Sequence, residues 1–247
     1  MTLQQFFWEH PRIALAFSGG VDSAYLLYAA IQSGAAVKAY YVKSPFQPEF
    51  EYEDALALAA QLGAGMRTIC VDVLTDPKVT ANPANRCYFC KQRIFTAIAQ
   101  AALEDGFTEI MDGTNASDDA SDRPGMQALK ELKVLSPLRL CGLTKQEIRE
   151  RSRDAGLFTW DKPAYACLAT RIPAGTVITE EALLRTQQAE EYLKSLGFVD
   201  FRVRTLGDAA RIQVKEGQLS LLLANREEIL RELKKSYSAV LLDLEVR

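Results

Sequence analysis

Over its first 156 residues, the chain alternates short apolar runs with segments of helical periodicity. Short apolar runs that end at glycine or polar residues are typical of buried strands, and apolar residues three and four apart are typical of helices on a sheet. The predicted strands are 12–17, 36–42, 66–73, 109–114 and 134–138, and the predicted helices are 22–33, 48–63, 88–105 and 143–156. This alternation favours an α/β fold with a doubly wound parallel sheet.

The alternation stops at residues 157–178, which contain Pro163, Pro173 and Gly175. We therefore predict two domains, residues 1–176 and residues 177–247. The second domain is expected to contain helices at 180–197 and 219–235 and strands at 201–206, 209–215 and 239–246. This order predicts a small α+β domain. Residues 74–86 are expected to form a loop.

Composition limits where in the cell the protein is expected to act and which classes of partner it is expected to bind. The 247 residues carry a net charge of −3, which disfavours nucleic acid as the main partner. No apolar run approaches the roughly 20 residues that span a bilayer, and the start of the chain lacks the pattern of a secretory signal. The protein is therefore expected to be cytoplasmic, with no membrane partner. The five cysteines are an odd number, which argues against a disulfide framework.

The sequence Ala-Phe-Ser-Gly-Gly-Val-Asp-Ser at 16–23 follows the first predicted strand and opens the first predicted helix. Glycines allow a tight turn and close approach of a ligand, and the amide groups at a helix start favour phosphate. The predicted nucleotide-binding residues here are Ser18, Gly19, Gly20, Asp22 and Ser23. The turn is neither a Walker A loop nor G-x-G-x-x-G. The alternative is a tight connection with a serine cap.

A second polar segment, residues 111–119, follows the fourth predicted strand. Parallel strands end at one edge of the sheet, where folds of this class bind ligands. We predict that Gly113, Thr114 and Asn115 contact the nucleotide, and that Asp118 and Asp22 bind Mg²⁺. A solvated loop, and for Asp22 an acid that interacts with the helix dipole, are the alternatives.

Three cysteines are candidates for chemistry: Cys87 and Cys90 in a C-x-x-C, and Cys167 in a proline-framed loop. A zinc site needs four ligands, and the only histidine, His10, is near the start of the chain. A redox C-x-x-C, a 4Fe–4S cluster with one open iron, and a nucleophilic thiolate remain open. Cys70 is predicted to lie in the core and Cys141 to be a structural residue in a turn.

The motif S-G-G-x-D-S after the first strand resembles the PP-loop of the N-type ATP pyrophosphatases. The resemblance implies cleavage of ATP between the α- and β-phosphates, with Mg²⁺, to adenylate an oxygen of the substrate. AMP is then a far better leaving group than the original oxygen.

A closer resemblance, over roughly residues 10–215, is to the LarE family of pyridinium-3,5-biscarboxylic acid mononucleotide sulfurtransferases, which act in nickel-pincer cofactor synthesis. The motifs that carry it, in chain order, are SGGVDS, NPANRCYFCKQRIF, DGTNASDD, DRPGMQAL, SPL, LTKQEIR, WDKPAYACLATRIPAG and FRVRTLGDAARIQV. The resemblance implies a PP-loop domain followed by a domain that carries part of the site for a nicotinate-derived mononucleotide. It also implies a homo-oligomer, commonly a hexamer.

The family contains two versions of the sulfur chemistry. In one, a single cysteine that matches Cys167 is sacrificed and becomes dehydroalanine. In the other, three cysteines that match Cys87, Cys90 and Cys167 hold a 4Fe–4S cluster, and a sulfide source resupplies it. Because this chain has all three cysteines, we predict the cluster version, with the sacrificial use of Cys167 as its alternative.

Basic residues in the second half suit a phosphorylated, acidic substrate. Arg202 and Arg204 alternate along one predicted strand and therefore share a face, and arginine forks suit phosphate and carboxylate. The predicted substrate-binding residues are Arg171, Glu190, Arg202, Arg204 and Arg211. Exposed strand charges, and for Glu190 or its neighbour Glu191 a solvated helix face, are the alternatives.

Two other functions are considered. A tRNA thiolase of the same superfamily would need a basic surface and an RNA-binding element, neither of which is evident in the sequence. A nucleotide- or metal-binding regulator would release no pyrophosphate from ATP.

Overall fold

The computed structural model describes residues 1–118 and 124–246. The chain forms two compact units: unit 1 is Met1–Val73 with Asn85–Lys162, and unit 2 is Leu74–Ala84 with Pro163–Arg247. The sequence-based division into residues 1–176 and 177–247 stays a prediction. Asp119, Asp122 and Arg123, which belong to two of the motifs above, lie outside the described residues.

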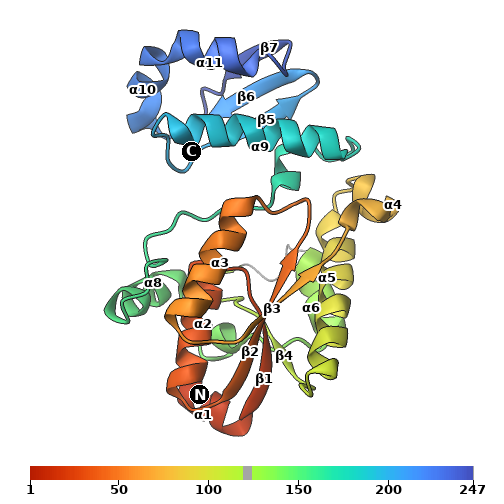
Figure 1. Ribbon diagram of the computed structural model, residues 1–247, viewed down its shortest axis with the longest axis vertical. Helices are drawn as coiled ribbons and strands as arrows, with labels where there is room; N and C mark the ends of the chain where they lie inside the picture. The colour runs from red at the N-terminus through yellow and green to blue at the C-terminus, as the bar shows by residue number, and fades with distance from the viewer. Residues whose placement is uncertain (119–123, 247) are drawn as a thin grey trace. The chain divides into compact units, whose positions relative to one another are not determined.

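Unit 1 is built on a four-stranded parallel sheet with the order β3-β2-β1-β4 (Figure 1). The strands are β1 (Arg12–Ala16), β2 (Ala36–Lys43), β3 (Met66–Cys70) and β4 (Ile110–Met111). The residues of β1 between its ends are fully buried, as expected for a central parallel strand covered on both faces. The predicted α/β class is confirmed.

Helices cover both faces of this sheet. The helices of unit 1 are α1 (Leu3–Glu9), α2 (Val21–Gln32), α3 (Glu49–Gln61), α5 (Arg86–Glu104), α6 (Pro124–Glu131), α7 (Pro137–Leu140) and α8 (Lys145–Asp154). In Figure 1, α5 and α6 lie on one side of the sheet, and α2 and α3 lie on the other. The sheet is therefore doubly wound, as predicted. No helix in the described residues is long and apolar enough to cross a bilayer.

Two predictions for unit 1 are wrong. The strand expected at 134–138 is reduced to one bridge between Met111 and Leu135, because Pro137 starts the short helix α7 and has no amide hydrogen for a ladder. Cys70, expected in the core, is exposed, because it is the last residue of β3 at the carboxyl edge of the sheet.

A capping box starts α8. The Thr144 side chain accepts from the Glu147 amide, and the Glu147 carboxylate accepts from the Thr144 amide at 2.8 Å. Two of the amides that a helix start leaves unpaired are satisfied in this way.

We expect Thr144→Ala to lower the free energy of unfolding by about 1 kcal/mol, because it removes one half of this box. Urea unfolding followed by circular dichroism measures the change. Gln146→Ala, at an exposed position of the same helix, is the control and should leave the midpoint in place. Equal midpoints for the two variants would contradict the prediction.

Unit 2 is a small α+β unit. Its main elements are α4 (Pro77–Thr80), α9 (Glu180–Ser195), α10 (Leu219–Ala224), α11 (Arg226–Leu233), β5 (Arg202–Leu206), β6 (Ala209–Gln213) and β7 (Ala239–Leu242). The β5–β6 pair is antiparallel and the β6–β7 pair is parallel.

The single helix predicted at 219–235 is two helices that meet at Asn225. The segment 74–86, predicted as a loop, contains α4, which is tied to the rest of unit 2 by the Ile178 amide bonded to the Thr80 carbonyl at 2.8 Å.

Candidate functional site

The candidate nucleotide site of unit 1 lies where β1 and β4 end. From β1 the chain first adds β2 and β3 on one side of the sheet, and it then returns to add β4 on the other side of β1. β1 and β4 are parallel neighbours, and the strand order reverses at β1. Ligands of doubly wound folds bind at the carboxyl edge at such a point. The two polar segments predicted from sequence, 18–23 and 111–119, both begin there.

The Ser-Gly-Gly turn leaves the amides at the start of α2 without a side-chain cap. Gly20 is the residue before the helix, and no side chain bonds to the first amides from that position. Gly19 has φ 71°, and a Cβ at this residue would lie 2.9 Å from the Ala55 Cβ, so only glycine fits. The Ser18 and Ser23 hydroxyls are 3.1 Å apart and hold the turn closed. The arrangement suits a phosphate bound at the helix start.

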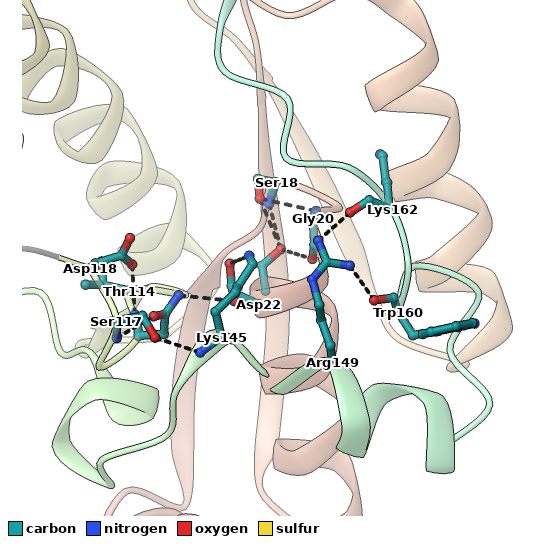
Figure 2. Close-up of polar contacts among 12 residues, drawn as sticks. Ser18, Gly20, Asp22, Thr114, Ser117, Asp118, Lys145, Arg149, Trp160 and Lys162 are labelled. Carbon is teal, nitrogen blue, oxygen red and sulfur yellow. Dashed lines mark hydrogen bonds and ion pairs between the residues drawn. The ribbon is translucent and has the colours of Figure 1, made fainter. Parts of the chain in front are cut away.

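Asp22 and Lys145 form an ion pair beside this turn (Figure 2). The Lys145 ammonium lies 2.5 Å from one Asp22 carboxylate oxygen, and the Asn115 amide donates to the other at 3.3 Å. The Asn115 backbone amide donates in turn to the Asp118 carboxylate at 3.1 Å. The predicted residues Asp22, Asn115 and Asp118 are thus brought together, with a cation that sequence reasoning missed.

Burial raises the pKa of the Asp22 carboxyl above its usual value. The hydrogen bond and charge of Lys145 oppose this change, the negative charge of Asp118 adds to it, and the Asn115 amide opposes it. Asp22 is therefore ionised at a free-energy cost to the folded protein, as is common at binding sites.

We expect Asp22→Asn to raise the melting temperature at neutral pH. Because the folded pKa of Asp22 is raised, the unfolded chain loses this proton first, and stability falls as the pH rises through the carboxyl range. The gain of the variant should therefore shrink as the pH falls through the raised folded pKa of Asp22, and it should be lost below about pH 4, the range of an unfolded aspartate. Thermal unfolding between acidic and neutral pH measures this. A less stable variant at neutral pH would contradict the prediction.

The loop after β4 is held by a buried carboxylate, Asp112. It accepts from the Thr114 hydroxyl at 2.6 Å and from the Ser136 hydroxyl at 2.7 Å. A Cβ at Gly113 would lie 3.0 Å from the Ser23 amide nitrogen, so glycine lets this loop pack against the start of α2. Gly113 and Thr114 therefore hold the loop after β4 in place against the start of α2.

Lys145, Arg139 and Arg149 are the basic residues that sequence reasoning missed. Arg139 donates to the Asp118 carbonyl. Arg149 donates to the Trp160 carbonyl at 2.6 Å (Figure 2). Lys145 lies directly after the helix cap in the motif Leu-Thr-Lys-Gln-Glu-Ile-Arg, which predicted a helix start and also carried part of the family resemblance, but no role was predicted for the lysine itself.

Cys87 and Cys90 lie on the first turns of α5, three residues apart and therefore on one face of the helix. Cys87 is exposed and lies 3.8 Å from an Arg86 guanidinium nitrogen, whereas Cys90 is half-buried. No group of three or more histidine, cysteine, aspartate or glutamate side chains able to hold a metal is found among the described residues. Cys167 belongs to unit 2.

In unit 2, four of the five predicted substrate-binding residues surround the segment that carries Cys167. Arg171 and Glu190 form a buried ion pair with 2.7 Å between the closest nitrogen and oxygen. Arg202 donates to the Ala164 carbonyl at 2.6 Å, and Arg204 donates to the Thr170 carbonyl at 2.8 Å. The fifth residue, Arg211, instead pairs with Asp243 at 3.4 Å.

Comparison with known proteins places this geometry in context. No protein-family model matches the chain. It is 31% identical over 246 residues to the pyridinium-3,5-bisthiocarboxylic acid mononucleotide synthase of Lactiplantibacillus plantarum, a match that covers 98% of this chain and 89% of that protein. It is 40% identical to an uncharacterized protein of Synechocystis sp., over 88% of this chain and 82% of the relative. A tRNA-specific 2-thiouridylase of Thermotoga petrophila is 26% identical, over 59% of this chain and 52% of the relative.

Proposed function

The chain belongs to the family of pyridinium-3,5-bisthiocarboxylic acid mononucleotide synthase, the LarE family, and from this premise we propose that it is an ATP-dependent sulfurtransferase that converts a carboxylate of pyridinium-3,5-biscarboxylic acid mononucleotide into a thiocarboxylate. The single observation that carries the proposal is the near full-length similarity to the synthase, whose name states a thiocarboxylate product. The arrangement of Asp22, Asn115 and Lys145 beside an uncapped helix start supports the use of ATP.

In the first step, a substrate carboxylate oxygen attacks the α-phosphorus of ATP, pyrophosphate leaves, and an acyl adenylate forms. The amides at the start of α2 bind the pyrophosphate, and the Lys145 ammonium offsets negative charge on the phosphates. Asp22 and Asp118 are the carboxylates proposed to bind Mg²⁺, in keeping with the preference of this ion for oxygen ligands. Asn115 holds the Asp22 carboxylate in place.

In the second step, sulfur attacks the acyl carbon and AMP leaves. If the sulfur is the Cys167 thiolate, a thioester to the protein forms. Loss of the Cys167 α-proton and cleavage of its Cβ–S bond then release the thiocarboxylate and leave dehydroalanine.

The cluster route is proposed for this chain because it has Cys87, Cys90 and Cys167. The thiols of Cys87 and Cys90 share one face of α5, as cluster ligands from a C-x-x-C do. Unit 1 therefore supplies two of the three thiols that the cluster needs. Cys87, Cys90 and Cys167 would hold such a cluster, and its chemistry would supply the sulfide to be transferred. A sulfide source, assembly into a homo-oligomer such as a hexamer, and a cytoplasmic location stay predictions.

The test is incubation of the anaerobically purified protein with MgATP and pyridinium-3,5-biscarboxylic acid mononucleotide. We expect substrate-dependent AMP and pyrophosphate in equal amounts, with the thiocarboxylate detected by mass spectrometry. Iron and acid-labile sulfide analysis of the same preparation tests the cluster. ATP that stays intact in the presence of the substrate would overturn the proposal.

The partial similarity to a tRNA-specific 2-thiouridylase supports one alternative, in which the adenylated oxygen belongs to a tRNA uridine. The alternative predicts pyrophosphate release with tRNA in place of the mononucleotide. It also predicts a tRNA gel shift that weakens steeply with salt.

A further inference from the structure

We propose that Arg171 and Glu190 are positioning residues that fix the segment around Cys167, and that Glu190 does not contact the substrate. We call residues 163–171 the cysteine loop. The inference rests on the proposed function only in that Cys167 is taken to be the thiol that takes part in sulfur transfer. All the residues that carry it lie in unit 2.

The Glu190 carboxylate has no capacity left for a ligand. One oxygen accepts from the Arg171 Nε at 2.7 Å and from the Val203 amide at 2.9 Å. The other accepts from the Arg171 Nη2 at 3.1 Å and from the Tyr165 hydroxyl at 2.6 Å. A carboxylate offers about four acceptor sites, and all are used here. Glu190 is 5% exposed, so its carboxylate is also shielded from a ligand in solution.

Arg171 connects this carboxylate to the backbone on both sides of Cys167. Its Nη1 donates to the Ala166 carbonyl at 2.9 Å and to the Thr170 hydroxyl at 2.8 Å. The same Thr170 hydroxyl donates to the Cys167 carbonyl at 2.9 Å. The side chain of Arg171 is fully buried, so the guanidinium acts as an internal brace of the cysteine loop.

Hydrogen bonding and charge keep this brace ionised. Burial alone would lower the pKa of Arg171, but the hydrogen bond and charge of Glu190, with the nearby Tyr165 and Cys167, leave it raised. A buried charge pair of this kind is costly to break from one side, because the remaining charge is left uncompensated.

Tyr165 and two further arginines complete the support. The guanidinium groups of Arg171 and Arg202 both lie over the Tyr165 ring, at 4.7 and 5.2 Å from its centroid. Arg202 and Arg204 donate to carbonyls near the two ends of the loop, at Ala164 and Thr170. Three arginines therefore hold three loop carbonyls, and the orientation of Cys167 is set before any substrate arrives.

The decisive experiment compares Glu190→Gln with Glu191→Gln. Glu191 is the next residue of α9, is exposed and bonds only to Gln187 in the described structure, so it is a matched control. For Glu190→Gln we expect amide hydrogen exchange in residues 163–172 to be at least about tenfold faster, with exchange in β5 and β6 unchanged. We expect the dissociation constant of pyridinium-3,5-biscarboxylic acid mononucleotide to stay within about twofold, and the single-turnover rate of sulfur transfer to fall about 100-fold.

Tyr165→Phe provides a second test if Glu190→Gln does not fold, because it removes one hydrogen bond to Glu190 and keeps the aromatic ring that contacts the two arginines. Weaker binding of the mononucleotide with loop exchange unchanged would overturn the inference in favour of a substrate contact. Faster exchange throughout unit 2 would overturn it in favour of a general structural role. Failure of the proposed function would give a different result. The wild type would then neither bind the mononucleotide nor release pyrophosphate, at any rate of amide hydrogen exchange in the cysteine loop.

Discussion

Cys167→Ser is expected to abolish formation of the thiocarboxylate, by at least about 10³-fold in a single turnover, while pyrophosphate release continues. Whether Cys167 donates the sulfur itself or is the third ligand of a cluster, its role needs a thiolate, and a serine hydroxyl neither ionises near neutral pH nor supplies sulfur. The candidate adenylation residues all belong to unit 1, so that step should persist. Rapid-quench mixing with radiolabelled ATP follows adenylation, and mass spectrometry follows the thiocarboxylate. Product from the variant at the wild-type rate would contradict this role of Cys167.

The double variant Cys87→Ser with Cys90→Ser separates the two sources of sulfur. If the cluster route operates, the wild type with added sulfide makes several equivalents of product without dehydroalanine, and the double variant makes at most one. If Cys167 is sacrificed, both proteins make one equivalent, and intact mass spectrometry shows loss of the elements of H₂S from each.

The parts of the site encoded by neighbouring residues could be predicted from sequence. The Ser-Gly-Gly turn lies directly between a buried strand and a helix, and φ 71° at Gly19 is a local requirement that the sequence reveals. The capping box of α8 is equally local. Burial was harder to predict, because the strand predicted at 66–73 does not reveal that β3 ends at Cys70, which is exposed at the edge of the sheet.

Long-range pairs were beyond sequence reasoning. Lys145 and Asp22 are 123 residues apart, and nothing in either segment specifies the other as its partner. Glu190 was singled out by resemblance, but only the fold reveals that its carboxylate is fully used by Arg171, Tyr165 and the Val203 amide. The charge pattern along β5 was compatible with solvent or substrate, and the structure instead directs Arg202 and Arg204 to loop carbonyls.

Lys145→Met is expected to slow adenylation by about 10²–10³-fold, the loss typical of removing one preorganised charge from a transition state. In the described structure, the ammonium uses one of its three hydrogens on Asp22, so it can keep this bond and still donate to a phosphate. Because burial raises the pKa of Asp22, that carboxylate is a poorly solvated anion, and the pair places the cation beside the start of α2.

The measurement for Lys145→Met is substrate-dependent exchange of labelled pyrophosphate into ATP, which reports adenylation without sulfur transfer. Lys145→Arg keeps the positive charge and should recover part of the rate, whereas Gln146→Met, at the next and exposed position of α8, should match the wild type. Normal exchange in Lys145→Met would assign this lysine to the folding of unit 1 alone. The negative charge of the phosphates would then have to be offset by Mg²⁺ and the α2 amides. In that case Asp22 and Asp118, the proposed Mg²⁺ ligands, would matter for adenylation and Lys145 would not.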